Sequence, residues 1–191
     1  MQDFPAEYSN EERRWLLRLA HLSIRSAVTG NKVTTPEATT HLKEPRGAFV
    51  TLHKNRELRG CIGMIAAVAP LDETVREMAR AAALEDPRFD PVSGAELDSL
   101  QLEISVLSPM FEIAPEDVVV GRHGLMMSYG GRRGLLLPQV PVEVGWDRET
   151  FLSQTCRKAG LPLDQWKKGA KIEAFTAEVF GEAEAGDSLR A

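Results

Sequence analysis

The residues best suited to chemistry lie in one short segment, Leu58-Arg59-Gly60-Cys61-Ile62-Gly63. The segment is typical of a β-strand, and the alternation of side chains along a strand puts Arg59 and Cys61 on the same face. A neighbouring guanidinium favours the thiolate, which is the nucleophilic form of cysteine. Gly60 and Gly63 would let another backbone or a ligand approach closely. The segment therefore predicts a functional site around Cys61, against the alternative that Cys61 is a small buried core residue.

The turn before this segment decides whether a histidine reaches the thiol. The preceding strand and the cysteine strand are predicted to form a β-hairpin across a polar turn. If Asn55 begins a three-residue loop, His53 lies opposite Arg59. Thr51 then lies opposite Cys61, and His53 is placed to act as a base near the thiol. If the loop has two residues, His53 points away from this cluster. The sequence leaves both registers open.

Three further residues are candidates for the site. Arg88 follows a helix that Pro87 must end, so it either caps the carbonyl groups of that helix or binds an anion in a groove. His123 lies in a glycine-flanked turn and is either a solvated loop residue or an acid or base, since the pKa of histidine lies near neutrality. Gln139 lies in a proline-bounded segment that we expect to be a stiff, extended connection. There its amide either binds a ligand or only spaces neighbouring elements.

The elements that position these residues can be predicted from periodicity and capping signals. Ser9 with Glu12 forms a capping box before an amphipathic helix, and Ser93 with Glu96 forms a second one. Further helices are expected from about Leu71 and after the N-cap residue Asp147, and strands are expected at residues 47–52, 58–65, 100–107, 125–129, 134–137 and 172–180. Because the strands come as hairpins, the sequence predicts an α+β fold with a largely antiparallel sheet and flanking helices.

The overall composition narrows the class of protein. A chain of 191 residues with 43% hydrophobic and 27% charged residues is predicted to form one globular domain over residues 1–191, with frayed ends at 1–8 and 181–191. A smaller C-terminal subdomain is compatible with this pattern. Two distant cysteines and the lack of a secretory or membrane-spanning segment predict a cytoplasmic protein.

Charge and residue spacing also argue against several partners. The formal net charge of -5 offers no broad cationic field for nucleic acid. The histidines are scattered, and neither a closely spaced Cys or His pair nor the three-cysteine cluster of a radical-SAM centre is present. We therefore expect no metal site and no cofactor. Cys156, at helical spacing with apolar residues, is expected to be a core residue.

The cysteine segment resembles the hallmark of the AMMECR domain, which is named for the AMME-syndrome chromosomal region. The resemblance covers nearly the whole chain in the order of the family's motifs. The matching segments, besides residues 58–63, are Gly47-Ala48-Phe49-Val50-Thr51-Leu52, Asp86-Pro87-Arg88-Phe89, Val106-Leu107-Ser108-Pro109, Gly121-Arg122-His123-Gly124-Leu125, Gly134-Leu135-Leu136-Leu137-Pro138-Gln139-Val140, Gly145-Trp146-Asp147 and Cys156-Arg157-Lys158-Ala159-Gly160-Leu161.

The resemblance implies an α+β fold and a groove lined by the cysteine motif, but it implies no reaction. It carries over Arg59, Gly60, Cys61 and Gly63 as site residues. Prokaryotic members of the family are called AmmeMemoRadiSam system protein A and tend to be encoded with a Memo-like protein and a radical-SAM protein. These two proteins are the partners that the resemblance implies.

Three functions remain as hypotheses. The first is an accessory or substrate-binding component that acts with those partners in a modification pathway and holds a small molecule, a peptide or a partner enzyme. The second is an enzyme in which Cys61 is the nucleophile, Arg59 favours its thiolate, and His53 or His123 moves protons. The third is a nucleic-acid-associated regulatory protein, which the charge of the chain disfavours.

Overall fold

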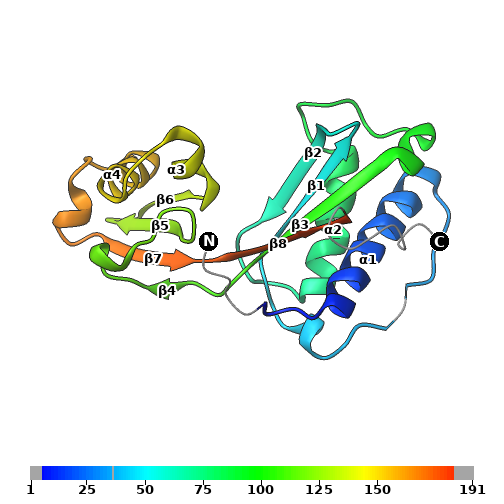
Figure 1. Ribbon diagram of the computed structural model, residues 1–191, viewed down its shortest axis with the longest axis horizontal. Coiled ribbons are helices and arrows are strands. Elements are labelled where there is room, and N and C mark those ends of the chain that lie inside the picture. The colour runs from blue at the N-terminus through cyan, green and yellow to red at the C-terminus, as the bar shows by residue number, and fades with distance from the viewer. Residues whose placement is uncertain (1–5, 36, 183–191) are drawn as a thin grey trace. The chain divides into compact units, whose positions relative to one another are not determined.

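The computed structural model describes residues 6–35 and 37–182, which fold into two compact units (Figure 1). The first unit comprises Met1–Leu107 with Glu178–Ala191, and the second comprises Ser108–Ala177. Each unit has its own four-stranded sheet, with strand order β2-β1-β3-β8 in the first and β4-β7-β5-β6 in the second. Strand β1 is antiparallel to β2 and β3, and β7 is antiparallel to β4 and β5. The predicted α+β fold is confirmed.

Two elements of the first unit begin at the capping boxes that the sequence predicts. Ser9 and Glu12 form the expected capping box at α1, and Ser93 and Glu96 form the other at η2. The elements are α1 (Asn10–Thr29), η1 (His41–Lys43), β1 (Ala48–Lys54), β2 (Glu57–Met64), α2 (Leu71–Leu84), η2 (Gly94–Ser99), β3 (Leu100–Leu107) and β8 (Ala177–Gly181).

The sheet of the first unit has one apolar face and one more polar face. Val50 and Leu52 of β1 are fully buried. Helices α1 and α2 lie side by side and cover this apolar face (Figure 1). Because side chains alternate along a strand, Thr51 of β1 and Cys61 of β2 point to the opposite face. The cysteine motif therefore crosses a sheet whose other face is anchored on two helices.

Gly60 is explained by helix packing. A Cβ atom at this position would lie 2.2 Å from the carbonyl oxygen of Ala82 in α2. At Gly63, a Cβ atom would overlap the ring of Phe49 on the neighbouring strand, 2.1 Å from its nearest carbon. The two glycines thus admit a helix backbone and an aromatic ring, and the space beside each is already filled.

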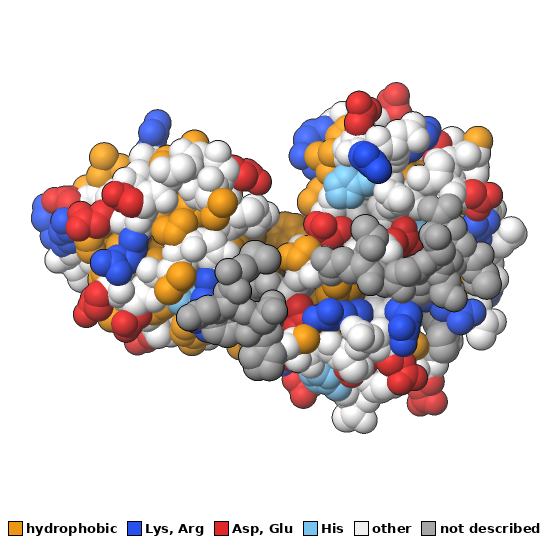
Figure 2. Space-filling model, in the orientation of Figure 1, with side chains coloured by type: hydrophobic (Ala, Val, Ile, Leu, Met, Phe, Trp, Pro, Cys, Tyr) orange, Lys and Arg blue, Asp and Glu red, His pale blue; other side chains and the backbone are white. Residues whose placement is uncertain are grey.

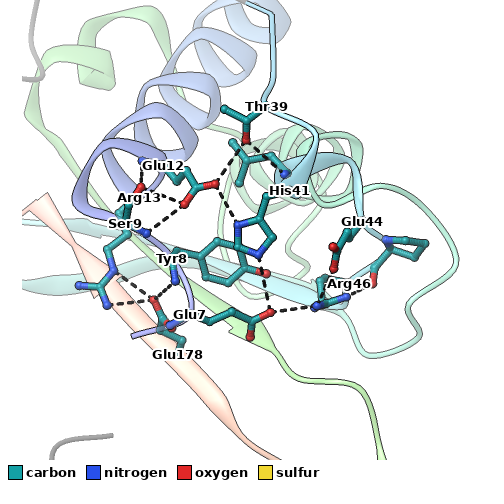
Figure 3. A network of polar contacts seen from close by, with 12 residues as sticks. Glu7, Tyr8, Ser9, Glu12, Arg13, Thr39, His41, Glu44, Arg46 and Glu178 are labelled. Carbon is teal, nitrogen blue, oxygen red and sulfur yellow. Dashed lines mark hydrogen bonds and ion pairs between the residues drawn. The ribbon is translucent and has the colours of Figure 1, made fainter. Parts of the chain in front are cut away.

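The segment before α1 is held by the polar network shown in Figure 3. Tyr8 is 1% exposed, and its ring stacks on His41 with the ring centroids 4.8 Å apart. The carboxylate of Glu178 on β8 accepts hydrogen bonds from the backbone N–H groups of Glu7 (2.6 Å) and Tyr8 (3.3 Å). The guanidinium of Arg13 donates to the same carboxylate at 2.9 Å. The network therefore ties the start of α1 to the last strand of the sheet.

One predicted strand is wrong, because it forms two strands in different sheets. Residues 172–180, predicted as a single strand, are divided between β7 in the sheet of the second unit and β8 in the sheet of the first. The sequence pattern shows two apolar runs here but not the break between them, at Thr176. The elements are β4 (Phe111–Glu112), η3 (Pro115–Asp117), β5 (Gly124–Tyr129), β6 (Arg132–Leu136), α3 (Gln139–Val144), α4 (Arg148–Lys158), η4 (Gln165–Lys167) and β7 (Lys171–Phe175).

The second unit has its own core, in which helix α4 packs against β5 and β6. Asp147 caps α4 by accepting a hydrogen bond from the backbone N–H of Thr150, as predicted. Cys156 of α4 is fully buried beside Phe151, so the expectation that it is a core residue is confirmed.

The two ends of the chain were expected to be frayed, and the structure describes only part of them. Of the segments expected to fray, residues 1–5 and 183–191 lie outside the described residues. Tyr8 makes the contacts given above, and Gly181 ends β8. Among the helices that the structure describes, none combines the length and the apolar character needed to cross a membrane.

Replacing Gly60 with alanine should destabilise the first unit. The added methyl group would overlap the backbone of α2, and overpacking of this kind costs about 1–3 kcal/mol. Urea unfolding should show this loss in Gly60→Ala. Gly94→Ala is the matched control, because nothing lies within 4 Å of a Cβ atom there, and its free energy of unfolding should change by less than about 0.5 kcal/mol. Equal stabilities of the two variants would contradict the packing role of Gly60.

Candidate functional site

The β1–β2 turn combines features of both predicted registers. Asn55 and Arg56 have φ angles of 54° and 68°, and Lys54 pairs with Glu57, so the turn has two residues. Positive φ angles at both central positions are those of a type I′ turn, the form that joins twisted strands best. The register then shifts by one residue farther along the hairpin.

A β-bulge at Arg59 causes this shift. His53 pairs with Leu58, whereas Leu52, the residue before it on β1, pairs with Gly60. Arg59 therefore has no partner on β1. From there on, Thr51 lies opposite Cys61, as the three-residue loop would have placed it. His53 does not lie opposite Arg59, so the register that made His53 a base for the thiol is not the one observed. The bulge therefore gives the thiol a hydroxyl neighbour.

The thiol of Cys61 is half-buried and accepts a hydrogen bond from Thr51. The distance from Thr51 Oγ1 to Cys61 Sγ is 3.3 Å. The alternative that Cys61 is a fully buried core residue is therefore wrong.

Arg59 is paired with a carboxylate. Its guanidinium donates from Nε to Glu96 Oε1 at 3.0 Å and from Nη2 to Oε2 at 3.3 Å. Lys54 donates to the same carboxylate at 3.0 Å. The Arg59 hydrogen bonds, with those from Ser93, hold the pKa of Glu96 well below its usual range. Arg59 thus links η2 to the hairpin, and its predicted effect on the thiol stays a prediction.

Asp86 and Arg88 hold the backbone of Cys61. The N–H of Cys61 donates to Asp86 Oδ2 at 2.8 Å, and Arg88 Nη2 donates to the carbonyl oxygen of Cys61 at 3.3 Å. Because β2 is an edge strand, these polar groups would otherwise have no strand partner on that side. The two side chains replace the missing strand at Cys61.

The Asp86–Arg88 pair is itself tightly organised. Arg88 donates from Nε to Oδ1 of Asp86 at 2.9 Å and from Nη2 to Oδ2 at 2.7 Å, and its backbone N–H donates to Oδ1 at 3.1 Å. The side chain of Asp86 is 3% exposed and that of Arg88 is 53% exposed. A two-point arrangement of this kind fixes both groups more strongly than a single contact.

Electrostatics link this pair to Cys61. The guanidinium of Arg88 and the N–H of Cys61 hold the pKa of Asp86 far below its usual range, despite burial. The hydrogen bond to Asp86 raises the pKa of Arg88. The guanidinium that contacts the backbone of Cys61 is that of Arg88, for which the sequence left a helix cap and an anion site as alternatives.

Sequence reasoning missed Asp86. A signal was present, because an aspartate immediately before a proline at a helix end often accepts hydrogen bonds from nearby backbone N–H groups. Arg88 was the only residue of this segment proposed for the site. The contact of Asp86 with Cys61, 25 residues earlier in the chain, could not be inferred from local spacing.

His123 lies in the second unit and is 5% exposed, so the expectation of a solvated loop histidine is wrong. Its Nδ1 accepts a hydrogen bond from the backbone N–H of Val119 at 3.2 Å, and the ring of Phe111 meets it edge-on. Burial lowers the pKa of His123, and the charge of Arg122 lowers it further. A neutral ring that closes a turn is the role these contacts describe.

Gln139 is exposed at the start of α3, so the predicted extended connection is wrong at this point. Pro138 precedes this short helix with a helical backbone, φ -58° and ψ -33°. Proline is favoured at helix starts because its fixed φ suits the helix, and this explains the difference. Gln139 and His123 belong to the second unit, and Arg59, Gly60, Cys61, Gly63 and Arg88 belong to the first.

Comparison with known proteins identifies the family. The AMMECR1 family model matches residues 17–180. The chain belongs to the AMMECR1 family. It is similar to Protein MJ0810 of Methanocaldococcus jannaschii, with 44% identity over 184 residues that cover 91% of this chain and 92% of the relative. It is also similar to Protein TK0174 of Thermococcus kodakarensis, with 45% identity over 187 residues that cover 91% of each chain.

A solved structure supports the fold of this AMMECR1-family chain. The crystal structure of the uncharacterized protein PH0010 from Pyrococcus horikoshii matches it with a TM-score of 0.76 and 43% sequence identity. The match covers 93% of this chain and 94% of the other. The family and the fold are therefore established by independent comparisons.

Asp86→Asn should destabilise the first unit by about 1–3 kcal/mol, because the buried pair loses its charge and some of its hydrogen bonds. Asp86 has a lowered pKa when folded, so its contribution is complete above the unfolded value of about 3.9 and is lost as the pH falls below it. Urea unfolding at about pH 7 and pH 3 should show a larger acid loss in the wild type than in the variant.

Asp98→Asn is the control for this experiment. Asp98 forms an ion pair with Arg25 and its side chain is 88% exposed, so the substitution should change the free energy of unfolding by less than about 0.5 kcal/mol. An Asp86 variant as stable as this control at neutral pH would show that the hydrogen bonds of Asp86 to Arg88 and to the Cys61 backbone contribute little to stability.

Proposed function

We propose that this protein is a binding component, an accessory subunit that recognises a substrate or partner through the face of the first sheet around Cys61. In this proposal it acts with Memo-like and radical-SAM proteins in a modification pathway. The observation that carries the proposal is the clamp of Asp86 and Arg88 on the backbone of Cys61, with the thiol left half-buried. A rigid backbone that presents a small side chain suits recognition, because little entropy is lost on binding.

The immediate contacts of the thiol favour binding over catalysis. Thr51, the hydrogen-bond donor to the thiol, carries a hydroxyl group, which is a poor general base near neutral pH. Arg59 is paired with Glu96, and His53 pairs with Leu58 across the hairpin. The residues that the sequence proposed as catalytic helpers are thus engaged in other contacts or placed in another register.

The residues around Cys61 form a mixed surface, which we call the cysteine face. Phe49 and Thr51 lie on β1, and their partners on β3 are Ser105 and Glu103. Together with Cys61, they supply an aromatic ring, hydroxyl groups, a thiol and a carboxylate. An apolar centre with a few polar groups is the usual composition of a recognition surface.

Surface charge favours a protein or small-molecule ligand over nucleic acid. Figure 2 shows basic and acidic side chains interspersed over the visible face of each unit. Together with the net charge of -5, this mixture of charges offers little attraction to a phosphate backbone.

Thr51→Arg should weaken binding to the partner proteins. The larger side chain would cover the cysteine face, and a tenfold loss of affinity corresponds to about 1.4 kcal/mol. Isothermal titration calorimetry with the Memo-like and radical-SAM proteins of the same organism should show at least about a tenfold loss for one of them. Cys61→Ser should stay within about twofold of the wild type.

Thr29→Arg is the matched control, because Thr29 is exposed at the last turn of α1. It should bind as the wild type does. Unchanged binding by Thr51→Arg, or no binding by the wild-type protein, would contradict the proposal.

The enzyme hypothesis remains a second candidate because the Thr51 hydroxyl donates to Cys61 Sγ at 3.3 Å. Such a donor stabilises a thiolate. Cys156 is an internal reference, since burial raises the pKa of its thiol. Alkylation of Cys61 that is already maximal at about pH 6, with Cys156 unreactive, would favour the nucleophile. A rate that still rises above about pH 8 would favour the binding role.

A further inference from the structure

One edge of the Arg88 guanidinium is left available beside Cys61. The Nε and Nη2 groups are bonded to Asp86, and Nη2 also reaches the carbonyl oxygen of Cys61. Within residues 6–35 and 37–182, no hydrogen bond involves Nη1 of Arg88. Nη1 carries two N–H donors in the plane of the guanidinium. More than half of the side chain is exposed, so these donors can meet a ligand.

The position of this edge is fixed. Asp86 is buried and holds the opposite edge of the guanidinium through two hydrogen bonds. The guanidinium also lies over the ring of Phe89, 5.5 Å from its centroid. A planar donor group held on one edge and packed on one face loses little freedom when a ligand binds the other edge.

We propose that Arg88 forms an oxyanion subsite beside Cys61, where Nη1 binds a carboxylate or phosphate group of the ligand. This inference rests on the proposed binding role of the cysteine face. It specifies one chemical group that the ligand should carry. Each N–H of Nη1 can donate a charge-assisted hydrogen bond to one oxygen atom of either group, while Asp86 and Cys61 occupy the paired donors of Nε and Nη2.

The surroundings limit which anions can use the subsite. Asp86 neutralises the charge of Arg88, so attraction at long range is weak and an anion gains mainly by direct hydrogen bonds to Nη1. Glu103 pairs with Thr51 on the β3 side of the cysteine face and would repel an anion there. The ligand should therefore bring its oxyanion in from the free edge of β2.

Two alkylating reagents test the subsite through the thiol itself. Iodoacetate carries a carboxylate and iodoacetamide is its neutral analogue, so the ratio of their rates at Cys61 does not depend on the thiolate fraction. In the native protein this ratio should exceed the ratio for the unfolded chain in urea by about threefold, the size expected for one exposed charged contact. Arg88→Gln should return the ratio to the unfolded value, and Arg88→Lys should give an intermediate value.

Arg76→Gln is the matched control, because it removes one arginine from the exposed side of α2. It should keep the wild-type ratio. Equal ratios in the wild type and in Arg88→Gln, or an equal drop in Arg76→Gln, would overturn the subsite.

A measurement on the wild type alone covers the case in which Arg88→Gln fails to fold. Inorganic phosphate or acetate, compared with chloride at equal ionic strength, should slow alkylation by iodoacetate about threefold. Protection by phosphate alone would assign the subsite to phosphoryl groups, and protection by acetate alone would assign it to carboxylates. Equal rates in all three salts would overturn the proposal. This readout uses no partner protein, so its failure is distinct from a failure of the binding role.

Discussion

The carboxylate of Asp86 fixes the edge strand on which Cys61 lies. Strand β2 has β1 on one side, and its other side would expose unpaired backbone groups. At Cys61 these groups are bonded to Asp86 and Arg88. An unpaired buried carboxylate is costly, and Asp86 avoids that cost by accepting hydrogen bonds from a backbone N–H and a guanidinium. The position of Cys61 depends on these hydrogen bonds from and to its backbone.

Helix α2 brings Asp86 to the strand. The missing side chain of Gly60 lets the carbonyl oxygen of Ala82 approach the strand, and the helix ends soon after, at Leu84. Asp86 follows two residues later and meets the residue next to Gly60. The cysteine segment and the Asp86-Pro87-Arg88-Phe89 segment, both noted in the resemblance to the AMMECR domain, are thus two halves of one arrangement. The packing of α2 against Gly60 therefore also positions the groups that hold the backbone of Cys61.

The extent to which the sequence predicted this arrangement differs between its parts. The capping box at Ser9, the strand at residues 100–107 and the N-cap at Asp147 follow from local spacing, and the structure confirms all three. The register of the hairpin does not, because the bulge at Arg59 leaves no signal in the local sequence pattern. Neither of the two registers considered was complete, since the observed one has a two-residue turn and a bulge.

The contacts around Cys61 differ from those that the sequence suggested. Cys61 was weighed as a reactive thiol beside Arg59 and as a small buried core residue, and the structure leaves it half-buried. Arg59 is paired with Glu96, and Arg88 is the residue that donates a hydrogen bond to the backbone of Cys61. Long-range ion pairs of this kind leave no periodic trace in a sequence. The buried His123 shows the same limit, because a glycine-flanked turn does not reveal whether another ring will cover it.

Amide hydrogen exchange at Cys61 tests the central claim most directly. Backbone N–H groups alternate in direction along a strand, so the Cys61 N–H points to the free edge and that of Ile62 points to β1. The clamp predicts slow exchange at both amides in the wild type. In Asp86→Ala, the Cys61 amide should exchange at least about tenfold faster while that of Ile62 stays protected. A Cys61 amide that exchanges rapidly in the wild type would contradict the account.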